Sequence, residues 1–230
     1  MTKTNSKKAL LSSAFALVLS VAMLIGTTFA WFTDTASTGI NKIQAGNLDV
    51  KLMYSTDMVT WKEATDQTKL FNDNALWEPG YTQVVYLKVV NAGNLALKYE
   101  TGFSKNYTSN RGKNVNGDWY RVDNYLKIGT AETETKFANR EAVWAAVAAT
   151  EKTLSKEIML TDGWVTLEAG KASKPFAVAI YMPTSVGNEA NASRLRPSSV
   201  SGLGIEVRAT QATVESDSFG SNYDANTATV

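Results

Sequence analysis

The sequence predicts an all-β fold with a minor α component. Several segments alternate apolar and polar residues with a period of two, which is typical of strands that bury one face. One segment, residues 140–149, is instead rich in alanine, the best helix former. Several strands combined with a single helix favour a β-sandwich that carries one short inserted helix as a cover.

The first half of the chain contains three expected strands. Leu48, Val50 and Leu52 alternate with polar or longer side chains, which predicts a half-buried strand at 48–53. Residues 82–90 carry Val, Tyr or Leu on both faces, which predicts a central strand. A turn at 78–80 precedes this strand, because Pro79 fixes φ and Gly80 accepts a left-handed conformation.

A second short turn is expected at 91–94, followed by a strand that contains Leu95, Leu97 and Tyr99. Strands joined by so short a turn pair antiparallel in a hairpin. We therefore expect the strand at 82–90 to pair directly with the one that follows it.

The second half of the chain contains further expected strands at 164–167, 176–182 and 203–214. In the last of these, Ile205, Val207 and Ala209 alternate with polar residues, which predicts a half-solvated strand.

The expected helix begins after Asn139, whose side chain can cap the free amides. Its apolar stripe of Val143, Trp144 and Val147 is expected to pack onto a sheet rim. The polar segments 104–118 and 185–201 are expected to be long surface loops.

Charge and composition exclude several classes of function. The chain has 23 basic and 22 acidic side chains, and the first thirty residues contain three lysines and no acid. The remainder is therefore slightly acidic and lacks the clustered basic face that nucleic-acid binding requires.

The chain has no Cys and no His, which excludes disulfides, thiolate or imidazole metal sites and the usual catalytic triads. We expect no enzymatic activity.

The N-terminal thirty residues have the pattern of an export signal. Lysines at 7 and 8 precede an apolar run over residues 9–30. Thr28 and Ala30 occupy the −3 and −1 positions of a small-x-small cleavage site, so we expect the mature chain to begin at Trp31. Because the apolar run is about long enough to span a bilayer, an uncleaved anchor is the alternative.

The expected organisation is a signal (1–30), a mobile N-terminal arm (31–38) and a single domain (39–230). The arm begins with two large aromatic residues and continues with short polar residues that are compatible with a strand. A disordered terminus is the alternative interpretation.

A series of motifs follows in order along the chain. They are residues 26–34, 45–50, 78–80, 90–95, 181–183, 187–191, 209–212 and 215–220. This ordered set resembles the TasA/camelysin family of secreted proteins, whose signal peptides are processed by a SipW-type signal peptidase. The resemblance implies a jelly-roll β-sandwich and, as in the best understood members, an extracellular biofilm matrix fibre. It leaves residues 104–160 without a matching motif.

The resemblance and the arm together predict a mechanism of assembly. An extended arm adds to the exposed sheet edge of the next subunit, with Trp31, Phe32, Thr33, Asp34 and Thr35 as the donated residues. Because the operation does not close on itself, it produces a filament. The expected partners are further copies of the chain, the SipW-type peptidase and a fibre-anchoring surface protein. The expected location is the extracellular matrix or the cell surface, with membrane contact only through the uncleaved signal.

The acidic residues and the tryptophans suggest two other kinds of site. No cofactor is expected, because acidic residues spread over loops are usually solvated and no EF-hand spacing is present. Calcium is the alternative, with Glu215, Asp217 and Asp224 as its candidate ligands. Four tryptophans, Trp61, Trp77, Trp119 and Trp164, are expected to fill the core. The alternative is a sugar-stacking platform, which would make the protein a cell-surface carbohydrate-binding module.

Overall fold

A computed structural model describes residues 15–18, 33–37, 48–72, 75–103, 106–156 and 158–212. The chain divides into two compact units, Met1–Phe32 and Thr33–Val230. Within the first unit, residues 15–18 are helical and exposed. No helix among the described residues is long and apolar enough to cross a membrane.

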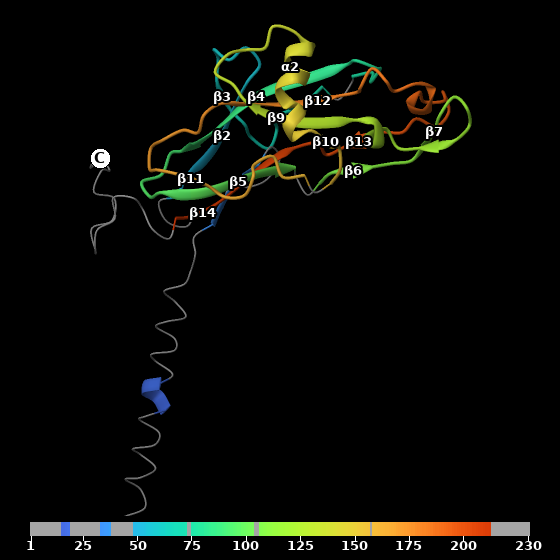
Figure 1. Cartoon of the computed structure of the whole chain (residues 1–230). Coiled ribbons are helices and arrows are strands. Elements are labelled where there is room, and N and C mark those ends of the chain that lie inside the picture. Colours follow the sequence, from blue (N-terminus) through green and yellow to red (C-terminus); the bar gives the residue numbers. More distant parts are fainter. Residues whose placement is uncertain are drawn as a thin grey trace, which may run out of the picture. The chain divides into compact units, whose positions relative to one another are not determined.

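In its described residues the second unit is mostly β, with antiparallel sheets and one short α-helix, which confirms the predicted class at this level. Its larger sheet has six strands in the order β10-β9-β12-β4-β2-β3 (Figure 1). In that order the strands are β10 (Lys152–Thr153), β9 (Lys127–Glu132), β12 (Phe176–Tyr181), β4 (Thr82–Asn91), β2 (Val50–Ser55) and β3 (Lys62–Glu63).

The second sheet has four strands in the order β1-β14-β5-β11. These strands are β1 (Thr33–Ser37), β14 (Ile205–Gln211), β5 (Leu97–Phe103) and β11 (Val165–Leu167). Two small ribbons complete the β structure. They pair β13 (Val200–Ser201) with β6 (Thr108–Ser109), and β7 (Gly112–Lys113) with β8 (Trp119–Tyr120).

The core draws apolar side chains from both large sheets. The predicted alternation in β2 is confirmed, because Leu48, Val50 and Leu52 are all buried. The predicted central strand is confirmed as well, since β4 lies between β12 and β2. The four-stranded sheet contributes Leu97, Tyr99, Phe103, Ile205, Val207 and Ala209 to the same cluster. Burial of this shared apolar surface holds the two sheets in one folded unit.

The turn at 78–80 forms as predicted, with Gly80 at φ +89° and the amide of Tyr81 donating to the carbonyl of Glu78. The predicted hairpin between β4 and β5 is wrong. The segment that follows Asn91 leads from the six-stranded sheet into the four-stranded sheet, where β5 pairs with β14 and β11. The short turn therefore connects the two sheets.

The helix α2 (Arg140–Val147) begins as predicted, because the Asn139 side chain accepts a hydrogen bond from the amide of Ala142. It packs on a sheet face, whereas the sequence predicted a sheet rim. Val143 and Val147 form a second buried cluster with Ala179 and Tyr181 of β12. Gly129 of β9 lets the end of the helix approach closely, since a Cβ there would lie 2.7 Å from the Cβ of Val147.

The two segments predicted as long surface loops are more ordered than expected. Residues 106–118 include β6 and β7, and residues 185–201 include β13 and a 3-10 turn, Asn188–Ala190. The two segments pair with each other through β6 and β13. Another 3-10 turn, Val122–Tyr125, carries Asp123, whose buried carboxylate accepts hydrogen bonds from the hydroxyls of Tyr107 and Ser109. Loops far apart in the sequence thus form one lobe.

Candidate assembly edge

Several of the predicted site residues lie outside the described residues. These are the cleavage-site residues Thr28, Ala30 and Trp31, the arm residue Phe32, and the candidate calcium ligands Glu215, Asp217 and Asp224. The remaining arm residues, Thr33, Asp34 and Thr35, belong to β1.

The strand β1 pairs antiparallel with β14 of its own chain. Thr33 lies opposite Thr210, Thr35 opposite Arg208, and Ser37 opposite Glu206. The backbone of 33–37 therefore has a partner within its own chain. This pairing makes β1 an edge strand of the four-stranded sheet, with β14 as its neighbour.

The strand β14 depends on partners along both of its edges. On one side it pairs with β5 over its whole length, from Ile205 opposite Phe103 to Gln211 opposite Leu97. Its inward side chains Ile205, Val207 and Ala209 are buried in the shared core. Without β1, the backbone N–H and C=O groups on its other side would form an open edge of the sheet.

Charged side chains from β14 and β5 lie next to this edge, and sequence reasoning did not identify them. Arg208 lies 3.6 Å from a carboxylate oxygen of Glu100 on β5 and 3.6 Å from one of Glu206. Glu206 is only 6% exposed, so the prediction of a half-solvated outer face is wrong at this position. The second oxygen of Glu206 has no hydrogen-bond partner among the described residues. Glu206 lies two residues from Arg208 on the same face of β14, which alternation within one strand already shows. The approach of Glu100 depends on the register of β14 with β5, which places Glu100 opposite Arg208 and which a single strand does not show.

The four tryptophans are spread over separate elements. Trp77 packs partly buried against the core and makes an edge contact with Tyr81, as expected. Core filling is wrong for Trp119 and Trp164, each of which is 50% exposed. No ring contact joins two of these four tryptophans within the described part of the chain. A platform built from all four is therefore not observed there.

Two buried tyrosines have raised pKa values. Burial raises the pKa of Tyr107, and its hydrogen bond to Asp123 adds to the effect. Burial also raises the pKa of Tyr181, whose hydroxyl donates a hydrogen bond to Glu151. The indole of Trp144 on α2 stacks on the ring of Tyr181, with the two ring centroids 5.4 Å apart.

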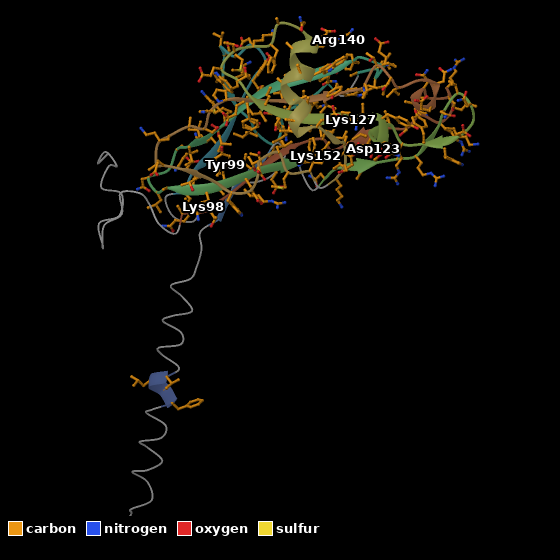
Figure 2. All side chains as sticks on the ribbon, viewed as in Figure 1. Lys98, Tyr99, Asp123, Lys127, Arg140 and Lys152 are labelled. Carbon is orange, nitrogen blue, oxygen red and sulfur yellow. The ribbon has the colours of Figure 1, made fainter. Side chains whose placement is uncertain are left out.

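The residues labelled in Figure 2 come from several elements, with Lys98 and Tyr99 on β5, Lys127 on β9 and Lys152 on β10. Across the described ranges, no three acidic residues form a metal-binding group.

Comparison of the chain with protein-family models, with curated proteins and with solved structures finds no match.

Proposed function

We propose that this protein is a secreted structural subunit of an extracellular, biofilm-type matrix fibre, with a jelly-roll β-sandwich fold and no enzymatic activity. A SipW-type peptidase releases the chain by cleavage after Ala30. The segment Trp31–Thr38 is then donated as a strand to the next subunit, and a fibre-anchoring surface protein holds the filament. The resemblance of the ordered motifs to the TasA/camelysin family supports this proposal, together with the position of β1.

The observation that carries the proposal is the pairing of β1 with β14. The strand β1 is the first element of its compact unit, and it lies at an edge of the four-stranded sheet. The ten residues 38–47 join it to Leu48, and a fully extended segment of that length spans about 33 Å. In the proposed exchange, β1 leaves its own β14 and pairs with the β14 of a neighbour in the same register.

Exchange alone leaves the backbone pairing unchanged, since one β1–β14 pair replaces another. The pairing within one chain has an additional advantage, because a tethered strand has an effective concentration in the ~mM range. Filament formation therefore requires further contacts. In the proposal Trp31 and Phe32 provide them by entering apolar pockets of the neighbouring subunit, since large aromatic side chains contribute most to interface energetics.

The proposal is tested by comparing purified chains that begin at Trp31 and at Gly39. We expect the first chain to form filaments in electron micrographs and the second to remain monomeric, because the second lacks the donated strand. Normal filaments from the chain that begins at Gly39 would contradict strand donation.

A synthetic peptide of residues 31–38 provides the matched addition experiment. We expect it to raise the melting temperature of the chain that begins at Gly39, because it restores the missing partner of β14. A control peptide with Thr35→Pro lacks one backbone N–H and has a fixed φ, so it should stabilise the chain less. Equal stabilisation by both peptides would show that β14 does not bind the arm as a strand.

A further inference from the structure

The β7–β8 hairpin lies in the lobe that the two long polar segments build. Lys113 pairs with Trp119 across the ribbon. The buried side chain of Asn114 closes the loop by accepting hydrogen bonds from the amides of Asn116 at 3.1 Å and Asp118 at 2.8 Å. The loop conformation is therefore set by internal hydrogen bonds.

The segment 191–196 runs alongside this hairpin. The amide of Lys113 donates to the carbonyl of Arg196 at 2.8 Å, and the amide of Ser193 donates to the carbonyl of Lys113 at 2.8 Å. The approach at Gly112 leaves no room for a side chain, since a Cβ there would lie 2.3 Å from the backbone nitrogen of Ser198. Backbone contacts thus hold Arg196 beside the hairpin.

Three cationic side chains converge on the indole of Trp119. The guanidinium of Arg111 lies 4.8 Å from the ring centroid, the ammonium of Lys113 5.2 Å, and the guanidinium of Arg196 5.7 Å. Half of the Trp119 surface remains exposed. We call Arg111, Lys113, Trp119 and Arg196 the cationic Trp119 cluster. Cations close to an indole face are held there by its quadrupole.

The charges of this cluster are available to a ligand. In the part of the chain that the structure describes, none of its three cations forms an ion pair or a side-chain hydrogen bond with another residue. The neighbouring Arg194 and Leu195 are exposed as well, and the one acidic residue of the hairpin is Asp118. Three positive charges gathered at one aromatic surface, on a chain that is otherwise slightly acidic, complement a local anion.

We propose that the cationic Trp119 cluster binds a carboxylate-bearing polysaccharide. A sugar ring stacks on the exposed part of the indole, while Arg111 and Arg196 bind its carboxylates, to which guanidinium groups are geometrically matched. The cluster is too small, and the rest of the chain too acidic, to follow a nucleic-acid backbone. This ligand is bound by a monomer, so the site is independent of fibre assembly.

Titration of the purified chain with polygalacturonate tests the site. We expect saturable binding in isothermal calorimetry, and a change in tryptophan fluorescence that disappears in Trp119→Ala. Trp119→Ala should weaken binding about tenfold, which corresponds to loss of one stacking contact. Arg111→Gln combined with Arg196→Gln should weaken it by at least about tenfold, through loss of two charge-assisted contacts.

Matched controls come from equally exposed residues elsewhere. Trp164→Ala removes another tryptophan that is 50% exposed, and Lys62→Gln with Lys171→Gln removes two exposed charges. Neither control should change the affinity. Unchanged affinity in both Trp119→Ala and the double arginine variant, with native circular dichroism, would overturn the site.

Two further probes test the ligand class. Neutral dextran should not bind, because it offers no charge to the arginines. Single-stranded DNA presents both rings and phosphates, so tighter binding of DNA than of polygalacturonate would overturn the assignment to a polysaccharide. Binding of dextran as tight as that of polygalacturonate would overturn the role of the three cations.

Discussion

A single aspartate organises the turn that follows β2. The carboxylate of Asp57 accepts hydrogen bonds from the amides of Val59 at 2.9 Å and Thr60 at 2.7 Å, and from the hydroxyl of Ser55 at 2.8 Å. These bonds favour the ionised form, so the two amides, and after them the hydroxyl, hold the pKa of Asp57 well below its usual range. Met58 adopts a positive φ of 65° in the same turn. The carboxylate therefore stabilises a backbone conformation that non-glycine residues rarely adopt.

The depressed pKa of Asp57 predicts a pH dependence. Because its folded-state pKa is below the unfolded value, its contribution to the free energy of unfolding is present above about pH 4 and is lost as the pH falls further. We expect wild type to be more stable than Asp57→Asn at pH 7, and the difference to shrink between pH 4 and pH 2. Chemical unfolding at each pH measures it.

The exposed residue Asp66 provides a control for this prediction, because Asp66→Asn changes the same net charge in a nearby loop. A stability difference between wild type and Asp57→Asn that stays constant from pH 7 to pH 2 would show that the carboxylate is not the cause.

A buried asparagine bonds the turn that connects the two sheets. Asn91 ends β4 and is fully buried. Its Nδ2 donates to the carbonyls of Leu95 at 2.8 Å, Leu167 at 3.2 Å and Glu168 at 3.1 Å, and its Oδ1 accepts from the amide of Gly93 at 3.0 Å. The side chain thus satisfies backbone groups of both the turn and β11.

Replacing the donor of Asn91 tests its importance. Asn91→Asp has almost the same shape, but it turns an oxygen toward three carbonyls and buries a charge. We expect it to lower the free energy of unfolding by about 3 kcal/mol, because buried carbonyls lose their donor. Urea unfolding measures the change. The exposed Asn94→Asp in the same turn is the control, and a loss of equal size there would contradict the explanation.

At the scale of the whole molecule, β1 determines whether the four-stranded sheet is complete within one chain. The sheet ends at β1 on one side and at the three-residue β11 on the other. Strand donation requires that β1 leaves its own β14, while the six-stranded sheet and the shared core remain folded. The two sheets can therefore respond differently to assembly.

A reversible crosslink tests this exchange. The chain has no cysteine, so Thr33→Cys with Thr210→Cys introduces a single pair at opposite positions of β1 and β14. We expect the oxidised variant to remain monomeric in sedimentation and electron microscopy, because its arm cannot leave. Reduction should restore polymerisation.

The matched control joins β2 to β3 through Met53→Cys with Glu63→Cys, which are also opposite in register. It should polymerise in both redox states. Filaments from the oxidised Thr33→Cys, Thr210→Cys variant would exclude donation of β1.

Local patterns in the sequence predicted β2, β4, β5, β11, β12, β14 and α2, but not β9, which is six residues long and lies inside the larger sheet. Alternation predicted β2, β12 and β14, and a run that is apolar on both faces predicted β4, because such patterns are a property of a few neighbouring residues. The Asn139 cap and the alanine-rich stretch after it predicted α2 for the same reason. These features depend on contacts within about ten residues, and such contacts are visible in a single sequence.

Contacts between segments far apart in the chain could not be predicted from the sequence, and only the tertiary structure shows them. The assignment of β4 and β5 to different sheets, the pairing of β1 with β14, and the approach of Arg196 to Trp119 each join residues far apart in the chain. Such pairings follow from which apolar faces bury one another, and many partners compete for each face until the whole core forms. Local sequence patterns were enough to predict six of the strands and the helix, and to show the composition of the arm. The tertiary structure decided that the arm has a partner within its own chain, and that one exposed tryptophan gathers three cations.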